Sequence, residues 1–189
     1  PDVRRMLLTQ KSYVEGGLAL ILYVAMLLDR IEVAPDAAEK ERLGLLLDVL
    51  TPIVKAWPSQ WCLKANDLAI QVLGGYGYTR DYPLEQYYRD NRLNPIHEGT
   101  DGIQSLDLLG RKVIMQEGRA LAILVEEIER TLASAPAALS DEAAALRGAV
   151  TRIVSVTQKV WSDGNPDTAL ANSFLYLEAF GHMVIAWMW

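Results

Sequence analysis

The stretch Asp2–Ile31, DVRRMLLTQKSYVEGGLALILYVAMLLDRI, decides the fold class, because its apolar residues recur with a period near 3.6. Asp2 is well placed as the N-cap. The pattern predicts one long helix, in which Gly16-Gly17 mark either a soft spot or a point of close packing. The repeating positions are Val3, Met6, Leu7, Tyr13, Val14, Leu18, Ile21, Leu22, Ala25 and Leu28.

Helical patterns continue on the C-terminal side of this stretch. Pro35 ends the first helical pattern, and a stripe of leucines over 43–50 predicts a second helix. Thr51-Pro52 is typical of an N-cap followed by proline at the first helical position, so a third helix is expected from there to Gly74. Pro58 should kink or interrupt that third helix.

A short helix is expected over 84–92, and Thr100 is the expected N-cap of a fourth long amphipathic helix. No segment has the pattern of a strand. Four long helices joined by short connections predict an all-α fold that begins with an antiparallel four-helix bundle.

The composition of the sequence changes near residue 118, where an acidic helix and then a linker rich in Ala, Pro and Ser follow. We therefore expect two domains, 1–117 and 118–189. Helices over 119–132 and 141–161 and a last one from Asp167 onward would form a second, smaller helical unit. The linker ASAPAALS separates the first two of these helices. The first residues are already in helical register and the last ones end inside an apolar pattern, so both ends are expected to be cuts through a longer protein.

The composition is that of an ordinary globular protein, with 51% hydrophobic and 22% charged residues. The net charge of −6, without a basic run longer than Arg4-Arg5, disfavours nucleic-acid binding. The apolar stretch 171–189 is interrupted by Asn172, Glu178 and His182, so it lacks the roughly 18 uninterrupted apolar residues expected of a membrane span. A single cysteine, Cys62, excludes an internal disulfide and favours a cytoplasmic location.

The loop GGYGYT at 74–79 follows a predicted helix and lacks a Gly-Lys-Ser/Thr ending, so it is neither a Rossmann fingerprint nor a P-loop. Its glycines suit a helix C-cap followed by a turn. Alternatively, bare backbone at Gly74 and Gly75 would let a pyrophosphate approach closely. The neighbouring tyrosines could form a stacking surface, although burial with the hydroxyl at the edge is the commoner arrangement; they are Tyr76, Tyr78, Tyr82, Tyr87 and Tyr88.

A metal site is not expected, because His97, His182 and Cys62 share no recognised metal-ligand spacing. Glu98 stands just before an expected helix start, where a carboxylate is favoured by the helix dipole. On helix statistics alone this is the commoner reason for such a carboxylate, and the alternative is that Glu98 is a general base.

Taken together, QVLGGYGYTRDYPLEQYYRDNRLNPIHEGTDGIQSLDLLGRKV (71–113) resembles the C-terminal helical domain of the FAD-dependent acyl-CoA dehydrogenases. The likeness lies in Gln-x-x-Gly-Gly-x-Gly-Tyr, Tyr-Pro-x-Glu, Arg-Asp and Glu-Gly-Thr, in this order. It covers about residues 1–115. The added helical unit is similar to that of a larger subgroup with an extra C-terminal segment.

The resemblance implies roles for individual residues. Glu98 would abstract the α-proton of an acyl-CoA thioester while a hydride passes from the β-carbon to FAD, and Gly99 would lie beside the substrate. Thr100 and Gln104 would lie near the FAD of their own subunit. The FAD of a partner subunit would be contacted by Gln71, Gly74 and Gly75.

The sequence departs from the family pattern at two positions. Gly102 stands where many members have glutamine, so one side-chain contact to the cofactor is missing. His97 stands where tyrosine or another aromatic residue is common, and either a tuning or a packing role would suit it.

The resemblance also implies partners: a homodimer or homotetramer that shares FAD sites, and electron-transfer flavoprotein as the electron acceptor. The domains that bind most of the flavin and substrate are not in this sequence, so the 189 residues alone are expected to be inactive. Two rival hypotheses remain: a non-enzymatic helical oligomerisation module, and a dehydrogenase-like protein associated with nucleic acid.

Overall fold

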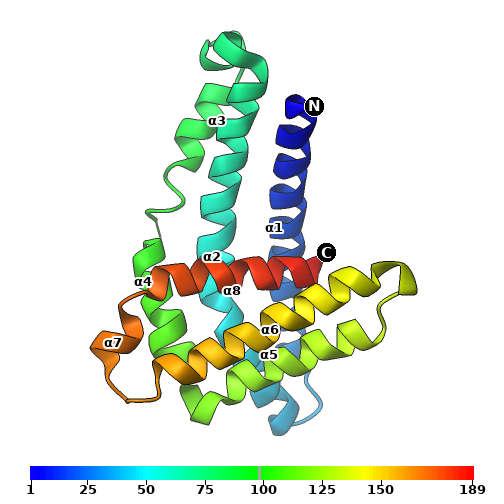
Figure 1. Cartoon of the computed structure of the whole chain (residues 1–189), viewed down its shortest axis with the longest axis vertical. Coiled ribbons are helices and arrows are strands. Elements are labelled where there is room, and N and C mark those ends of the chain that lie inside the picture. The colour runs from blue at the N-terminus through cyan, green and yellow to red at the C-terminus, as the bar shows by residue number, and fades with distance from the viewer. Residues whose placement is uncertain (98) are drawn as a thin grey trace.

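The computed structural model describes residues 1–97 and 99–189. Two long helices, α1 (Asp2–Glu32) and α2 (Ala37–Leu73), lie side by side and are joined by a tight connection (Figure 1). The chain then forms a short 3-10 turn, η1 (Gly74–Tyr78), and helix α3 (Leu84–Asn91), which packs back against α2. In the described ranges no strand occurs, and the all-α prediction is confirmed.

Helix α4 (Asp101–Asp107) continues into a π-helical turn, η2 (Leu108–Lys112). Helix α5 (Met115–Ala133) follows, and the turn η3 (Ala137–Leu139) leads to α6 (Ser140–Val160). Helices α7 (Pro166–Leu170) and α8 (Ser173–Met188) complete the chain. Helices α5, α6 and α8 lie across the α1–α2 pair (Figure 1).

The second and third predicted helices are one continuous helix, α2, and this corrects the sequence-based prediction. Thr51 does not begin a helix; its hydroxyl donates to the carbonyl oxygen of Leu47 at 2.7 Å. Neither Pro52 nor Pro58 interrupts α2. Both prolines are buried in the core, so tertiary packing outweighs the lost backbone hydrogen bonds. The antiparallel four-helix bundle is therefore not confirmed in its detail.

The last predicted helix is also divided in two. It ends as α7 at Leu170 and resumes as α8 at Ser173. The SDGNP break is confirmed: Gly164 has a φ of 66°, and the side chain of Asn165 caps α7 by accepting from the Asp167 N–H at 3.0 Å.

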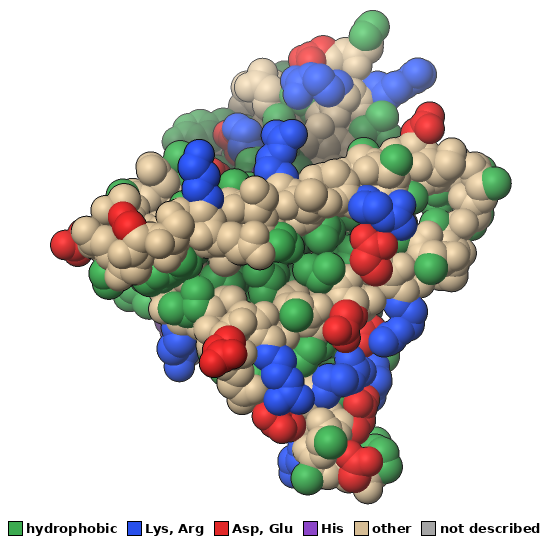
Figure 2. All heavy atoms as spheres, turned by 60° about the horizontal axis from the view of Figure 1, so that its bottom comes forward, with side chains coloured by type: hydrophobic (Ala, Val, Ile, Leu, Met, Phe, Trp, Pro, Cys, Tyr) green, Lys and Arg blue, Asp and Glu red, His purple; other side chains and the backbone are tan. Residues whose placement is uncertain are grey.

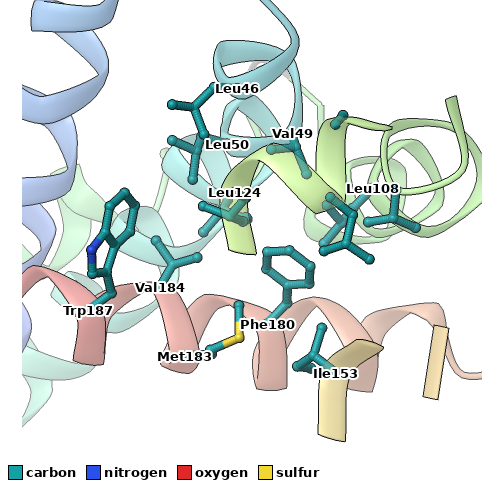
Figure 3. Close-up of a cluster of buried hydrophobic side chains, with 14 of the residues drawn as sticks. Leu46, Val49, Leu50, Leu108, Leu124, Ile153, Phe180, Met183, Val184 and Trp187 are labelled. Atoms are coloured by element: carbon teal, nitrogen blue, oxygen red, sulfur yellow. The ribbon is translucent and has the colours of Figure 1, made fainter. Parts of the chain in front are cut away.

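One hydrophobic core runs through α1, α2, η2, α5, α6 and α8. Phe180 of α8 lies at its centre and is fully buried, with Leu50 of α2 and Leu124 of α5 near it (Figure 3). The backbone turns sharply at Gln116, Glu117 and Gly118, all with positive φ, close to the expected domain boundary. The core nevertheless continues across this turn, and the division at 117/118 stays a prediction.

Helix α1 turns most of its apolar stripe away from the core. Leu7, Leu18 and Leu22 are exposed, whereas Gly16-Gly17 and Leu20 are buried against α2 and α8. Gly16-Gly17 are thus a point of close packing. A second apolar surface is the groove between α5 and α6, about 680 Å³ in volume, where Figure 2 shows hydrophobic side chains gathered in a hollow.

No helix in the described residues is both long and apolar enough to cross a membrane.

Candidate functional site

The glycine turn at the end of α2 presents bare backbone to the surface. Gly74 has a φ of 59° and its N–H donates to the carbonyl oxygen of Gln71, which closes the helix as a C-cap. A methyl group added at Gly74 or Gly75 would meet no atom within 4 Å. At Gly77 it would lie 2.4 Å from the carbonyl oxygen of Ile70, so this position is a close backbone approach. The turn therefore has both a structural role and an open face.

The tyrosines beside this turn are mostly exposed, contrary to the commoner arrangement for such residues. Tyr76 and Tyr78 are 70% and 79% exposed, and Tyr82 and Tyr87 are also exposed. Tyr88 is half-buried. Their rings are thus available at the surface next to the glycine turn, as a stacking surface requires.

The segment that leads to Glu98 is held by a ladder of asparagines. The Asn91 side chain donates to Asn66 of α2 at 2.7 Å, and the Asn94 side chain donates to Asn91 at 2.7 Å. The His97 N–H donates to the carbonyl oxygen of Leu93 at 3.0 Å. These bonds fix the chain against α2 directly before Glu98, which itself lies outside the described residues.

His97 lines a pocket of about 380 Å³ between this segment and α2. Sequence reasoning missed the α2 residues of this pocket, although a spacing of four and three residues places Lys55, Ser59 and Cys62 on one face of a helix. Burial raises the pKa of the Cys62 thiol. The lining residues are Val54, Lys55, Pro58, Ser59, Cys62, Asn91, Asn94 and His97.

On the other side of Glu98, Gly99 has a φ of 93°, which favours glycine. A methyl group there would lie 2.9 Å from Nε2 of Gln104, so Gly99 packs directly over that amide. Thr100 is the N-cap residue by backbone geometry, as predicted, but its exposed side chain makes no capping hydrogen bond. Gln104 is only 7% exposed, and its N–H donates to the Thr100 carbonyl oxygen at 3.0 Å.

Three charged side chains, those of Asp101, Glu178 and Arg92, lie near the start of α4. Partial burial, and next the carboxylate of Glu178, raise the pKa of Asp101, whereas Arg92 opposes the rise. The Gln60 side chain donates to Glu178 at 3.3 Å. The helix N-terminus and Arg92 thus stabilise a negative charge on Asp101, whereas the carboxylate of Glu178 in α8 destabilises it.

The predicted cofactor residues fall into two separate groups. Gly99, Thr100 and Gln104 lie together, whereas Gln71, Gly74 and Gly75 lie at the far end of α2 (Figure 1). Leu73, the last residue of α2, is eleven positions after Cys62 of the His97 pocket, which is about 16 Å along the helix at the usual rise of about 1.5 Å per residue. Within one chain the two groups do not form one site.

In the described part of the chain, no three His, Cys, Asp or Glu side chains are grouped as metal ligands.

Two family models match the chain. Residues 1–114 match the acyl-CoA dehydrogenase C-terminal domain, and residues 124–189 match a domain described as acetyl-CoA dehydrogenase C-terminal like.

Similar proteins cover nearly the whole chain. The 3-methylmercaptopropionyl-CoA dehydrogenase of Ruegeria pomeroyi is 33% identical over 99% of this chain and 32% of its own length. The broad-specificity linear acyl-CoA dehydrogenase FadE5 of Mycobacterium tuberculosis is 33% identical over 100% of this chain and 33% of its own length. The chain thus spans about a third of the length of these curated relatives.

The fold is also that of a solved structure. Caenorhabditis elegans ACDH-11, in complex with C11-CoA, superposes with a TM-score of 0.79 at 21% identity, over 97% of this chain and 32% of that one. At this level of identity the likeness concerns the fold alone.

Proposed function

Because the chain belongs to the acyl-CoA dehydrogenase family, we propose that it is the C-terminal helical part of a flavoprotein that dehydrogenates an acyl-CoA thioester between its α and β carbons. The observation that carries the proposal is the Glu-Gly-Thr motif in the sequence; the asparagine ladder fixes the residues that precede it, and Gly99 packs over Gln104. On its own, this chain is inactive, since its relatives are about three times as long.

Glu98 is the proposed catalytic base. An α-proton beside a thioester is weakly acidic, and a carboxylate removes it efficiently only in a dry pocket that raises the pKa of the carboxyl group. Gly99 is the proposed substrate neighbour because it directly follows Glu98 in the chain; its positive φ and its contact with the Gln104 amide restrict this position to glycine.

FAD is the proposed cofactor, and when bound it supplies the hydride acceptor. Gln71, Gly74 and Gly75 fit a pyrophosphate at the surface of a partner subunit, since the two glycines leave their backbone open and Gln71 is exposed. Thr100 is the proposed contact to the FAD of its own subunit; Gln104 contributes from beneath the surface, because it is buried. The distance between the two groups along α2 supports a cofactor site shared by two subunits.

We further propose that the intact protein is a homodimer or homotetramer in the cytoplasm, and that electron-transfer flavoprotein accepts its electrons. The exposed apolar face of α1 supports a place inside a larger assembly, since a monomer rarely leaves so continuous an apolar surface uncovered.

The test is Glu98→Gln in the full-length protein, with Glu142→Gln in α6 as the matched control. Glu142 is exposed and lies in the first turn of α6. Under anaerobic conditions, butyryl-CoA or octanoyl-CoA should bleach the flavin of the control, and Glu98→Gln should bind FAD but bleach at least about a thousandfold more slowly. Bleaching at the normal rate in Glu98→Gln would remove Glu98 from this role.

The rival hypothesis of an oligomerisation module makes a different prediction for Gly75. A methyl group at Gly75 meets no atom of this chain, so Gly75→Ala leaves the fold intact. In the proposed flavoprotein, Gly75→Ala and Gly75→Val should lower the FAD content of the purified full-length protein without lowering its content of helix. A pure oligomerisation module would show no change in FAD content.

A further inference from the structure

Helix α4, which follows the Glu-Gly-Thr motif, is hydrogen-bonded to α8 through two buried serines. Ser105 of α4 is 1% exposed and Ser173, the first residue of α8, is 8% exposed. Their hydroxyl oxygens are 3.0 Å apart. When the Ser105 hydroxyl donates to the carbonyl oxygen of Gly102, which lies 2.8 Å away, Ser173 is the donor within the pair. The start of α8 lies beside α4 in Figure 1.

The same C-terminal segment also holds the turn η2, into which α4 continues. Trp161, at the end of α6, donates its indole N–H to the Leu109 carbonyl oxygen at 3.1 Å. The side chain of Leu170, at the end of α7, lies 3.4 Å from the place of a methyl group at Gly110. Three contacts therefore arise between residues 161 and 173, and all three act on 105–110.

Gln104 of α4 contacts both Gly99 and Thr100, the second and third residues of the Glu-Gly-Thr motif. Gln104 is the neighbour of Ser105 in α4, and Gly99 packs over the Gln104 amide. The Gln104 N–H donates to the carbonyl oxygen of Thr100. A shift of α4 would therefore move the backbone of Gly99 and Thr100, which directly follow Glu98 in the chain.

We propose that the segment 161–173 supports the catalytic motif by fixing α4, and that Ser173 is a positioning residue for Glu98. The proposal rests on the proposed function of Glu98 as the base. It gives the additional helical unit a role in the reaction without any contact to substrate. Its physical basis is the steep dependence of proton abstraction on geometry, since a shift of about 1 Å can slow a reaction about a hundredfold.

The experiment compares Ser173→Val with Ser173→Thr in the full-length, FAD-loaded protein. The two variants have the same volume, and only threonine keeps the hydroxyl donor. The rate of flavin bleaching at saturating butyryl-CoA or octanoyl-CoA is measured with the FAD content and the concentration of acyl-CoA at half-saturation. Ser134→Ala is the control, because Ser134 is exposed, lies outside the segment 161–173 and donates to backbone carbonyl oxygens of its own helix end.

Ser173→Val should bleach about tenfold more slowly at saturation, with FAD content and half-saturation within about twofold of the unsubstituted protein. Ser173→Thr should recover most of the rate. Equal rates for Val and Thr, whether both normal or both slow, would overturn the proposal, because a mere packing role responds to volume and not to the hydroxyl.

If Ser173→Val does not fold, Trp161→Phe decides, since it removes the N–H donor to Leu109 and keeps the aromatic ring. It should slow bleaching several-fold, and a normal rate would overturn the proposal. Glu98→Gln separates this inference from the proposed function. If Glu98→Gln bleaches at the normal rate, Glu98 is not the base. If Glu98→Gln is slow but the Ser173 and Trp161 variants bleach at the normal rate, the segment 161–173 does not position α4 for catalysis, and Glu98 remains the proposed base.

Discussion

Gly181→Ala should destabilise the chain, although alanine is the better helix former. A methyl group at Gly181 of α8 would lie 2.4 Å from Cδ1 of Trp57, whereas carbon atoms in contact are separated by about 3.5 Å or more. The indole ring or α8 must therefore move by about 1 Å. Trp57 is buried and packs edge-on against Tyr13 at a centroid distance of 5.8 Å, so the ring has little room to move.

The magnitude follows from two opposing effects. Overpacking of a core costs about 1–3 kcal/mol, with the upper end expected for a contact with a ring. Replacing glycine by alanine inside a helix returns about 1 kcal/mol. The net loss for Gly181→Ala is about 1–2 kcal/mol, which lowers the melting temperature of a chain of this size by about 2–8 °C.

Gly44→Ala is the matched control, because Gly44 also lies inside a helix and a methyl group there meets no atom within 4 Å. It should gain about 1 kcal/mol from helix propensity alone. Thermal unfolding of the 189-residue chain, followed by circular dichroism, should therefore shift in opposite directions for the two variants. A melting temperature for Gly181→Ala at or above that of the unsubstituted chain would refute the close packing of α8 on α2.

Two further predictions concern buried polar groups and are also measured by denaturation of the chain in urea. The buried ammonium group of Lys112 pairs with the half-exposed carboxylate of Asp48. Asp48→Ala should therefore cost about 3 kcal/mol by leaving a buried charge unpaired, whereas Lys112→Met should cost less than about 1.5 kcal/mol; equal losses would contradict this asymmetry. The hydroxyl groups of Tyr176 and Thr157 are 2.5 Å apart, so Tyr176→Phe should cost about 1 kcal/mol at neutral pH. Burial raises the pKa of Tyr176 above its ordinary value of about 10, so the unfolded chain loses this proton first and stability falls as pH rises above about 10. The fall should be smaller in Tyr176→Phe, and an identical pH dependence in both proteins would argue against the burial of this phenol.

The sequence by itself determined the fold class and the local signals. The period of 3.6 identified α1 almost to the residue, Thr100 was correctly predicted as the N-cap residue of α4, and the SDGNP break was correctly located. These features depend on residues within a few positions of one another, so the sequence contains the whole physical cause. The ordered motifs around Glu98 likewise indicated the family, which the comparisons confirm.

Only the tertiary structure decided which helices continue and which faces are buried. Thr51-Pro52 has the local chemistry of a helix start, yet burial of both sides of α2 keeps the helix intact through it. Helix α1 is apolar on two faces, and the periodicity could not tell that Leu20 is buried while Leu22 is exposed. The bond between Ser105 and Ser173 joins residues 68 positions apart, and no local pattern encodes such a contact. Burial is a property of the whole assembled chain, so the sequence pattern predicts a helix without selecting the face that another helix will cover.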